Sequence, residues 1–292
     1  MMAPIDHWIR ENIAGPTRIE HLAERVLWQG KSPYQEILLA ENSALGKFLL
    51  LDGDMQSSTS DFAFYHELLV HPGVLAHPQP QRVLILGGGE GATLREVLRH
   101  ECVKEVVLVE QDATVVKVCR EFAPEFHGGA FHDPRCRMII GDAIHYLENA
   151  KGHFDVILAD LTDAGPKELD FKELYRLVSL RLGLDGLFCT QAGSGGLQQE
   201  GTFLRHYRML AKHWSKLCPM VDYIPCYHSL WCFLAASNVL IPSLVSADGV
   251  DQQLIHRGIT SLQAYDGAAH VRACHLPKHL RKALAHVRTG SA

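Results

Sequence analysis

The strongest constraint on the fold is the stretch of residues 83–100, where an apolar run passes directly into a string of glycines. Residues 83–86 are all apolar, glycine occupies positions 87, 88, 89 and 91, and apolar residues follow at helical spacing. This order predicts a strand, a tight turn and a helix. Gly87 and Gly89 would let backbone N–H groups and the helix N-terminus approach a ligand closely. For this stretch alone, an ordinary tight turn without a ligand is the alternative.

An acid, Glu110, ends the next apolar run at residues 106–109. In nucleotide-binding α/β folds an acid at this position binds the hydroxyls of a ribose. The glycines follow the spacing G-x-G-x-G rather than the G-x-G-x-x-G of dinucleotide-binding turns. The shorter turn and Glu110 together favour an adenosyl-sulfonium nucleoside, which has no diphosphate, over a dinucleotide.

Strand-like runs alternate with helical stretches from residue 81 to about residue 237. The predicted strands are residues 83–86, 106–109, 137–140, 156–159, 187–190, 220–224 and 231–236. This alternation predicts an α/β fold with a doubly wound, mostly parallel sheet of the Rossmann-like, class I methyltransferase type. Ligands of such sheets bind at the carboxyl ends of the strands.

The N-terminal part is predicted to form a small antiparallel β domain. Residues 1 to about 25 are interpreted as a loosely packed arm with one short helix. Strands are predicted at residues 34–40, 47–51 and 55–57, and a helix within residues 61–72 that Pro72 closes. We therefore predict two domains: residues 1–73, with the arm, the β domain and this helix, and residues 74–292, with the nucleoside-binding sheet and a C-terminal helical tail.

Composition narrows the classes of partner. A net charge of −5 provides no basic patch for nucleic acid, and no run of about 18 apolar residues could span a membrane. The N-terminus lacks the basic-then-apolar order of a secretory signal, so we expect a cytoplasmic protein. The eight cysteines form no C-x-x-C pair and the 18 histidines no H-E-x-x-H motif. We expect buried thiols, no metal, no nucleic-acid partner and no membrane contact.

Carboxylates follow several predicted strands and suit a cationic substrate. Glu90 lies in the glycine turn, and Asp160 and Asp163 follow the fourth strand. A primary amine is protonated at neutral pH, so it must lose a proton before it acts as a nucleophile. We interpret Asp160 as the base and Asp163 as the anchor of a second ammonium. Alternatively, Asp163 caps a helix beginning near Lys167, and Asp142 is equally consistent with a helix cap and with adenine binding.

The chain resembles the polyamine aminopropyltransferases, the family of spermidine, spermine and thermospermine synthases, from residue 26 to residue 285. The resemblance rests on ordered motifs: YQEI at 34–37, GKFLLLDGDMQS at 46–57, YHE at 65–67, GGGEGATLREVLRH at 87–100, LVEQD at 108–112, GDA at 141–143, FDVILADLTD at 154–163, TQAG at 190–193 and YDGAAHVRACHLPKHLR at 265–281. Three features resemble the thermospermine synthase branch more than typical spermidine synthases: the glutamate of GGGEG, the sequence MQS, and the pair Leu161-Thr162.

The resemblance implies transfer of a 3-aminopropyl group from decarboxylated S-adenosylmethionine, a co-substrate, to putrescine, spermidine or a related polyamine, with no further cofactor. Asp160 would accept the proton, assisted by Tyr65, and Glu90 would bind the ammonium of the donor. The donor nucleoside would be bound by Gln35, Glu110, Asp142 and Ala143, and the acceptor by His66, Asp163, Gln191 and Tyr227. The resemblance also suggests a homodimer or homotetramer.

Three departures from the family pattern fall on the acceptor side and the lid. Phe62 stands where the family has an acid, and the lid at residues 163–166 lacks the family's Asp-Pro pair. Residues 224–237 lack a glycine and place His228 and Trp231 beside the acceptor channel. These differences leave the identity of the acceptor open.

Other classes of function remain open at this point. They are an S-adenosylmethionine-using transferase that moves a 3-amino-3-carboxypropyl or methyl group onto a polyamine-like acceptor, a class I methyltransferase, and a silent polyamine-binding protein. The second acid after the fourth strand and the N-terminal β domain argue against a methyltransferase. The presence of Asp160 and Tyr65 argues against a binding protein without catalytic activity. Since Glu90 would repel a carboxylate, we expect the decarboxylated donor to be preferred.

Overall fold

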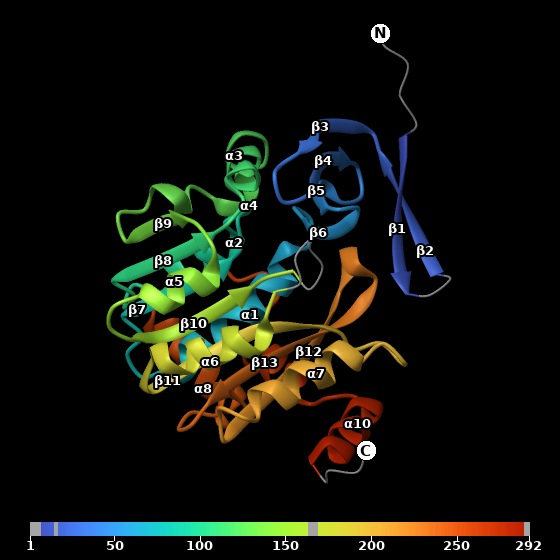
Figure 1. The fold of residues 1–292 in the computed structure, drawn as a ribbon. Helices are drawn as coiled ribbons and strands as arrows, with labels where there is room; N and C mark the ends of the chain where they lie inside the picture. Colours follow the sequence, from blue (N-terminus) through green and yellow to red (C-terminus); the bar gives the residue numbers. More distant parts are fainter. Residues whose placement is uncertain (1–6, 15–16, 163–168, 289–292) are drawn as a thin grey trace.

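A seven-stranded sheet forms the centre of the computed structural model, which describes residues 7–14, 17–162 and 169–288 (Figure 1). In spatial order its strands are β12 (Lys216–Ile224), β13 (Ser229–Ser237), β11 (Leu182–Ser194), β10 (Phe154–Asp160), β7 (Arg82–Gly87), β8 (Glu105–Glu110) and β9 (Cys136–Ile140). Neighbouring strands are parallel except that β13 is antiparallel to both β11 and β12. The chain therefore winds outward from β7 in both directions, and the predicted doubly wound sheet with all seven strands is confirmed.

Helices cover both faces of this sheet because its central strands are apolar on both sides. In β7, Val83 and Ile85 pack into one core cluster and Leu84 and Leu86 into another, and all four are fully buried. Each such side chain contributes roughly 1.5–3 kcal/mol on burial. The first face is covered by α1 (Phe62–Ala76), α2 (Ala92–Leu98), α8 (Ala247–His256) and α9 (Gly267–Cys274). The second face is covered by α5 (Ala143–Asn149), α6 (Phe171–Arg181), α7 (Gly201–Leu210) and α10 (Lys278–Arg288).

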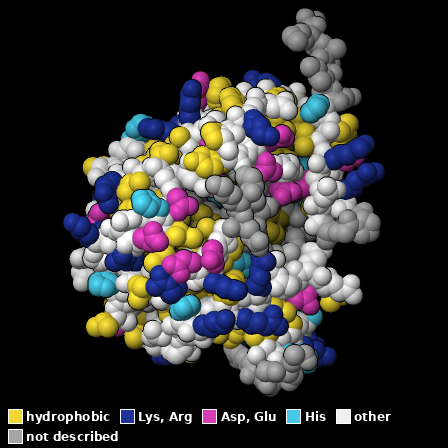
Figure 2. Space-filling model, in the orientation of Figure 1, with side chains coloured by type: hydrophobic (Ala, Val, Ile, Leu, Met, Phe, Trp, Pro, Cys, Tyr) yellow, Lys and Arg dark blue, Asp and Glu magenta, His cyan; other side chains and the backbone are white. Residues whose placement is uncertain are grey.

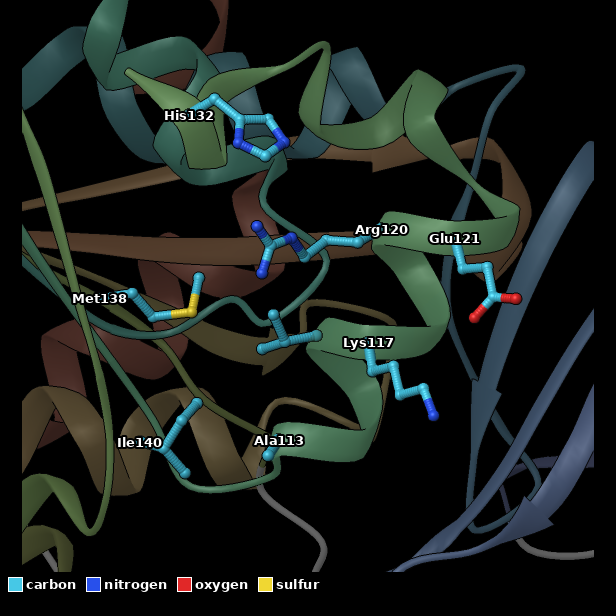
Figure 3. Close-up of a pocket in the computed structure, with 8 residues that line it drawn as sticks. Ala113, Lys117, Arg120, Glu121, His132, Met138 and Ile140 are labelled. Atoms are coloured by element: carbon cyan, nitrogen blue, oxygen red, sulfur yellow. The ribbon is translucent and has the colours of Figure 1, made fainter. Parts of the chain in front are cut away.

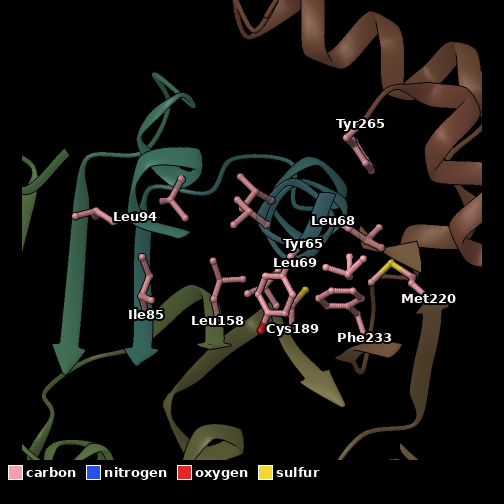
Figure 4. Packing of buried hydrophobic residues seen from close by; sticks show 14 of the residues in the cluster. Tyr65, Leu68, Leu69, Ile85, Leu94, Leu158, Cys189, Met220, Phe233 and Tyr265 are labelled. Carbon is pink, nitrogen blue, oxygen red and sulfur yellow. The ribbon is translucent and has the colours of Figure 1, made fainter. Parts of the chain in front are cut away.

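Helix α1 is the element that connects the N-terminal region with the first face of the sheet. Figure 4 shows Tyr65, Leu68 and Leu69 of this helix against Leu158 of β10 and Phe233 of β13. The helix was predicted to close at Pro72 but continues to Ala76. Pro72 lacks the N–H that would bond the carbonyl of Leu68, and a proline inside a helix is costly. Burial of the residues beyond it, Val74 and Leu75, offsets this cost.

The N-terminal region contains a four-stranded antiparallel sheet. Its strands are β3 (Arg25–Lys31), β4 (Glu36–Asn42), β5 (Gly46–Leu51) and β6 (Asp54–Ser58), paired in that order. Ile37 and Leu39 of β4 pack against Val115 and Val118 of α3 (Ala113–Phe122). The predicted small antiparallel domain is confirmed, with β3 as an additional strand, and it lies against the helix that follows Glu110.

The predicted arm with one short helix before residue 25 is wrong, because these residues form a hairpin of β1 (His7–Ala14) and β2 (Thr17–Ala23). Its side chains alternate with a period of two: Ile9 and Glu11 are buried, whereas Trp8 and Arg10 are exposed. Glu11 is fixed inside by the N–H of Met55, at 2.9 Å, and by contacts within the hairpin. Because one of the buried residues is the polar Glu11, this alternation of burial is only weakly visible as a hydrophobic pattern in the sequence.

Helix α6 begins at Phe171 rather than near Lys167, and Asp170 caps it by accepting the N–H groups of Lys172 and Glu173.

All eight cysteines are free, and five of them are buried. None of the helices in the described ranges has the length and apolar character needed to cross a membrane.

Candidate active site

The glycine turn brings the ends of β7, β8 and β10 together. Gly87, Gly88 and Gly91 have φ angles of +82°, +74° and +88°, which L side chains rarely adopt. A Cβ at Gly87 would lie 2.1 Å from the carbonyl oxygen of Asp160, and one at Gly89 would lie 3.0 Å from Oε2 of Glu110. Glycine is therefore required for the turn to fit between these two acids.

Asp160, at the end of β10, has a hydroxyl donor on each carboxylate oxygen. Tyr65 of α1 donates to Oδ1 at 2.9 Å, and Thr93 of α2 donates to Oδ2 at 2.6 Å. Burial and the charge of Asp160 raise the pKa of Tyr65 well above its usual value, so its hydroxyl stays protonated. The structure thus brings the two predicted catalytic residues into direct contact, and it adds Thr93, which the sequence interpretation did not single out.

His66 lies between Glu90 and Asp160. Its Nε2 is 2.8 Å from Oε1 of Glu90 and 3.8 Å from Oδ2 of Asp160, and its Nδ1 donates to the carbonyl of Phe62 at 2.7 Å. Burial by itself lowers the pKa of His66, but the charge and hydrogen bond of Glu90, with Asp160 and the Phe62 carbonyl, raise it to about 9. His66 is therefore a cation at neutral pH.

Glu90 is a buried carboxylate that His66 already engages. Its Oε1 is shielded from solvent and lies 2.8 Å from Nε2 of His66, and no further hydrogen-bond partner of this oxygen occurs among the described residues. A carboxylate has about four lone-pair positions on its two oxygens, so Glu90 can accept a hydrogen bond from a cationic group in addition to its contact with His66.

Glu110, at the end of β8, is held by the backbone. Its Oε1 accepts the N–H of Asp112 at 2.8 Å. Burial raises the pKa of Glu110 to about 7, with further contributions from the charges of Asp112 and Asp160 that the backbone N–H groups partly oppose. A carboxyl group in this state can both accept and donate hydrogen bonds to a diol.

The side chain of Gln35 is hydrogen-bonded to Asp112, which follows Glu110 in the chain. Asp112 is buried, caps α3 through the N–H of Thr114, and accepts from Gln35 Nε2 at 2.9 Å and from Ser32 Oγ at 2.6 Å. The small N-terminal sheet is thereby fixed to the loop that follows Glu110. The sequence placed Asp112 at this strand end but gave it no role.

Asp142 and Ala143 begin α5, next to the end of β8. The N–H of Gly141 donates to the carbonyl of Glu110 at 2.9 Å, which brings the two strand exits together. Asp142 is the N-cap of α5 and accepts the N–H of His145 at 2.7 Å. Of the two interpretations of Asp142, the structure shows the cap, and adenine binding stays a prediction.

Gln191 and Tyr227, which the resemblance assigns to acceptor binding, use their polar groups on the backbone. Gln191 donates from Nε2 to the carbonyl of Leu161 at 2.8 Å and accepts the N–H of Gly193 at 2.9 Å. Tyr227 donates to the carbonyl of Gln56 at 2.6 Å, and its ring lies edge-on to that of Tyr65 at 6.0 Å. Both residues therefore contact neighbours of Asp160, namely Leu161 and Tyr65, and their part in acceptor binding stays a prediction.

The departures from the family pattern have structural explanations. Phe62 is buried and packs edge-on against Phe126 of α4 (Pro124–His127), with ring centroids 5.9 Å apart. Trp231 packs against Tyr227 with ring centroids 4.8 Å apart, and His228 has a left-handed φ of +48°. Asp163 and the rest of the lid at residues 163–166 lie outside the described residues.

An open cavity of about 490 Å³ lies between α3 and β9 (Figure 3). Its charged lining consists of Lys117, Arg120 and Glu121, together with His132. With two cations against one carboxylate, this cavity would repel a polycation.

Figure 2 shows acidic and basic side chains interspersed over one face of the molecule. The negative charge of the candidate active site therefore comes from its own acids, Glu90, Glu110 and Asp160, and not from an acidic surface.

Metal binding has no support in the described ranges, since they contain no group of three or more His, Cys, Asp or Glu side chains placed to hold an ion. That the protein works without a metal stays a prediction.

Comparisons with known proteins bear on this site. Residues 62–242 match the model of the spermine/spermidine synthase domain, and residues 7–58 match the spermidine synthase tetramerisation domain. Polyamine aminopropyltransferase 2 of Hyperthermus butylicus is 40% identical over 91% of this chain and 88% of its own length. The polyamine aminopropyltransferase of Sulfurisphaera tokodaii is 37% identical over 90% of this chain and 88% of its own.

Solved structures agree with these relatives. A spermidine synthase in complex with the transition state analogue AdoDATO has a TM-score of 0.89 at 31% identity and covers 98% of this chain and 97% of its own. Spermidine synthase from Thermotoga maritima has a TM-score of 0.87 at 30% identity, with 98% and 96% covered. These names do not separate the thermospermine branch from the others, so that finer assignment stays a prediction. The synthase model spans more than half of the sequence, and the chain belongs to the spermine/spermidine synthase family.

Proposed function

We propose that this protein is a polyamine aminopropyltransferase that moves a 3-aminopropyl group from decarboxylated S-adenosylmethionine to an amine of putrescine, spermidine or a related polyamine. The observation that carries the proposal is the Asp160 carboxylate, held by Tyr65 beside the glycine turn, with His66 between it and the carboxylate of Glu90. In this proposal Asp160 is the base, Glu110 and the glycine turn bind the nucleoside, and Glu90 binds a cation.

The reaction would be a direct displacement. The acceptor amine gives a proton to Asp160, and its free electron pair forms a bond with the carbon attached to the sulfonium of the donor. The carbon–sulfur bond breaks and its electrons stay on sulfur, which leaves as neutral methylthioadenosine. Because a neutral thioether leaves readily, the protein mainly contributes orientation and deprotonation.

Each residue on the donor side would bind a different part of decarboxylated S-adenosylmethionine. Glu90 would bind the aminopropyl ammonium, Glu110 the ribose hydroxyls, and Gly87 and Gly89 would let the backbone approach the nucleoside. Asp142 and Ala143 would lie beside the adenine. Gln35 would act through Asp112, to which it is hydrogen-bonded at 2.9 Å.

On the acceptor side, Gln191 and Tyr227 would shape the wall, Tyr65 would keep Asp160 oriented, and Asp163 would bind a distal ammonium. His66 is a poor direct partner for a protonated amine because it is itself a cation. We propose that it contributes to this side by holding Glu90 and by limiting the negative charge around Asp160.

The choice of donor tests this proposal. A carboxylate about 4 Å from Glu90 would be repelled by roughly 1–4 kcal/mol, a preference of about fivefold to a thousandfold for the decarboxylated donor. The charge of His66, 2.8 Å from Glu90, partly cancels this repulsion, so we expect a value in the lower part of the range. The measurement is kcat/KM for both donors with putrescine and with spermidine, with product masses determined by mass spectrometry.

Two variants make this test specific. Glu90→Gln should reduce the preference towards unity, while Glu101→Gln, at an exposed position beyond α2, should leave it unchanged. Equal use of S-adenosylmethionine by the wild type, or products carrying a 3-amino-3-carboxypropyl or methyl group, would show that the alternative transferase is correct.

A further inference from the structure

Thr93 is a buried hydroxyl directed at the proposed base. It is the second residue of α2, its side chain is fully buried, and its Oγ1 lies 2.6 Å from Oδ2 of Asp160. The first turn of the helix does not use this hydroxyl, because the N-cap position is Gly91 and the cap makes no side-chain hydrogen bond. The hydroxyl of Thr93 is therefore committed to Asp160.

The two hydroxyls on Asp160 come from different helices. Tyr65 belongs to α1 and Thr93 to α2, and they donate to opposite oxygens of the same carboxylate. The torsion that rotates a carboxylate plane is soft, so one hydrogen bond does not define its orientation. A second donor on the other oxygen does. Thr93 is suited to this because its branched side chain has few rotamers.

The glycine turn makes the orientation more critical. A Cβ at Gly88 would lie 3.0 Å from Oδ2 of Asp160, so the backbone of the turn passes close to the same oxygen that Thr93 binds. His66 approaches this oxygen as well, at 3.8 Å. A rotated carboxylate would meet the turn on one side and the imidazole on the other.

We propose that Thr93 is a positioning residue of the transfer reaction, which fixes the plane of the Asp160 carboxylate together with Tyr65. The inference rests on the proposed function, because it gives Thr93 its effect through the base Asp160. It also assigns to α2 a part in the reaction besides presenting the glycine turn.

The test compares three variants. Thr93→Val keeps the shape of the side chain and removes the hydroxyl, and it should lower kcat by about tenfold to a hundredfold, part of the contribution of an oriented general base. The KM for the donor should change by less than about threefold. Thr93→Ser restores the donor and should recover most of kcat. Ser237→Ala is the control, since it removes a buried hydroxyl of β13 that bonds the carbonyl of Gly186, remote from the site, and its kcat should stay within about twofold.

Two further readouts separate positioning from a general effect on folding. In Thr93→Val the charged carboxylate has lost a donor, so the acid limb of the kcat/KM profile should move to higher pH by on the order of one unit. In an Asp160→Asn background, Thr93→Val should add little, because residues that act as a unit are not additive.

The outcomes separate the role of Asp160 from the role of Thr93. If Asp160→Asn keeps full turnover, Asp160 is not the base and the proposed function is refuted. If Asp160→Asn loses turnover but Thr93→Val keeps the kcat and the acid limb of the wild type, or if its loss is fully additive with Asp160→Asn, only the role of Thr93 is refuted.

Discussion

The imidazole of His66 lies between Glu90 and Asp160, and its charge makes the stability of the protein depend on pH. Its pKa is raised from 6.5 to about 9 by these carboxylates in spite of burial. A group with a raised pKa in the folded state contributes stability that is fully present below 6.5 and is lost as the pH rises through 9. We therefore expect wild type to lose roughly 3 kcal/mol of unfolding free energy, relative to His66→Gln, between pH 6.5 and 9.5.

The measurement is denaturant unfolding of both proteins at several pH values, in which the titration of groups remote from His66 cancels in the difference. Titration of His66 by NMR provides an independent value for its pKa. A difference in unfolding free energy that stays constant from pH 6 to 9.5 would contradict the assignment of a charged His66.

Several site residues could be predicted from sequence because strand ends converge. Asp160, Glu110 and the glycines follow buried strands, and parallel strands place their carboxyl ends on one edge. Thr93 and Asp112 could not be recognised as partners of the site. Their hydrogen bonds link residues 67 to 80 positions apart, to Asp160 and to Ser32 and Gln35, and no local pattern records such contacts.

At the scale of elements, Glu67 of α1 fastens the C-terminal part of the chain to the helix that carries Tyr65 and His66. Its buried carboxylate accepts the N–H groups of Gln263, Ala264 and Tyr265 at 2.8–2.9 Å. Glu67→Gln would turn an NH₂ group towards one of these donors. We expect a loss of about 2–4 kcal/mol in unfolding free energy and faster amide exchange at residues 263–265.

Glu36→Gln is the control for this prediction. Glu36 is exposed and forms a long 3.4 Å ion pair with Lys31, so its replacement should change the unfolding free energy by less than about 0.5 kcal/mol. Wild-type exchange at residues 263–265 in Glu67→Gln would show that the segment is held by other contacts.

Strands and helices of the large sheet were predictable because their apolar patterns are long and clear. The N-terminal hairpin was not, since its buried face includes the polar residues Glu11 and His21, which pair at 2.9 Å. A polar pair on the inner face weakens the hydrophobic alternation that defines a strand. The extension of α1 beyond Pro72 was missed because tertiary packing, which the local sequence does not show, overrides a local breaker.

At the scale of the whole molecule, the N-terminal region suggests assembly. Residues 7–58 match the tetramerisation model, and the hairpin of β1 and β2 stands at one side of the molecule (Figure 1) with Trp8 56% exposed. A two-stranded hairpin is marginal by itself. We expect a homodimer or homotetramer of the 32.5 kDa chain with this region in the contact.

Light scattering at micromolar concentration measures the molar mass of the assembly. Trp8→Lys should shift this mass towards that of a smaller assembly. Control variant Leu184→Lys changes an almost fully exposed leucine of β11, far from the hairpin in sequence, and should keep the mass of wild type. A monomeric wild type would refute the expected assembly.

Turnover of Asp160→Asn with saturating donor shows whether Asp160 accepts the proton of the acceptor amine. Asparagine keeps the size of the side chain and can accept a hydrogen bond but cannot take the proton. We predict that kcat falls by about two to four powers of ten while donor binding, measured by calorimetry, stays nearly intact. The exposed control Asp185→Asn should behave as wild type. Wild-type turnover in Asp160→Asn would show that Asp160 is not the base of the transfer reaction.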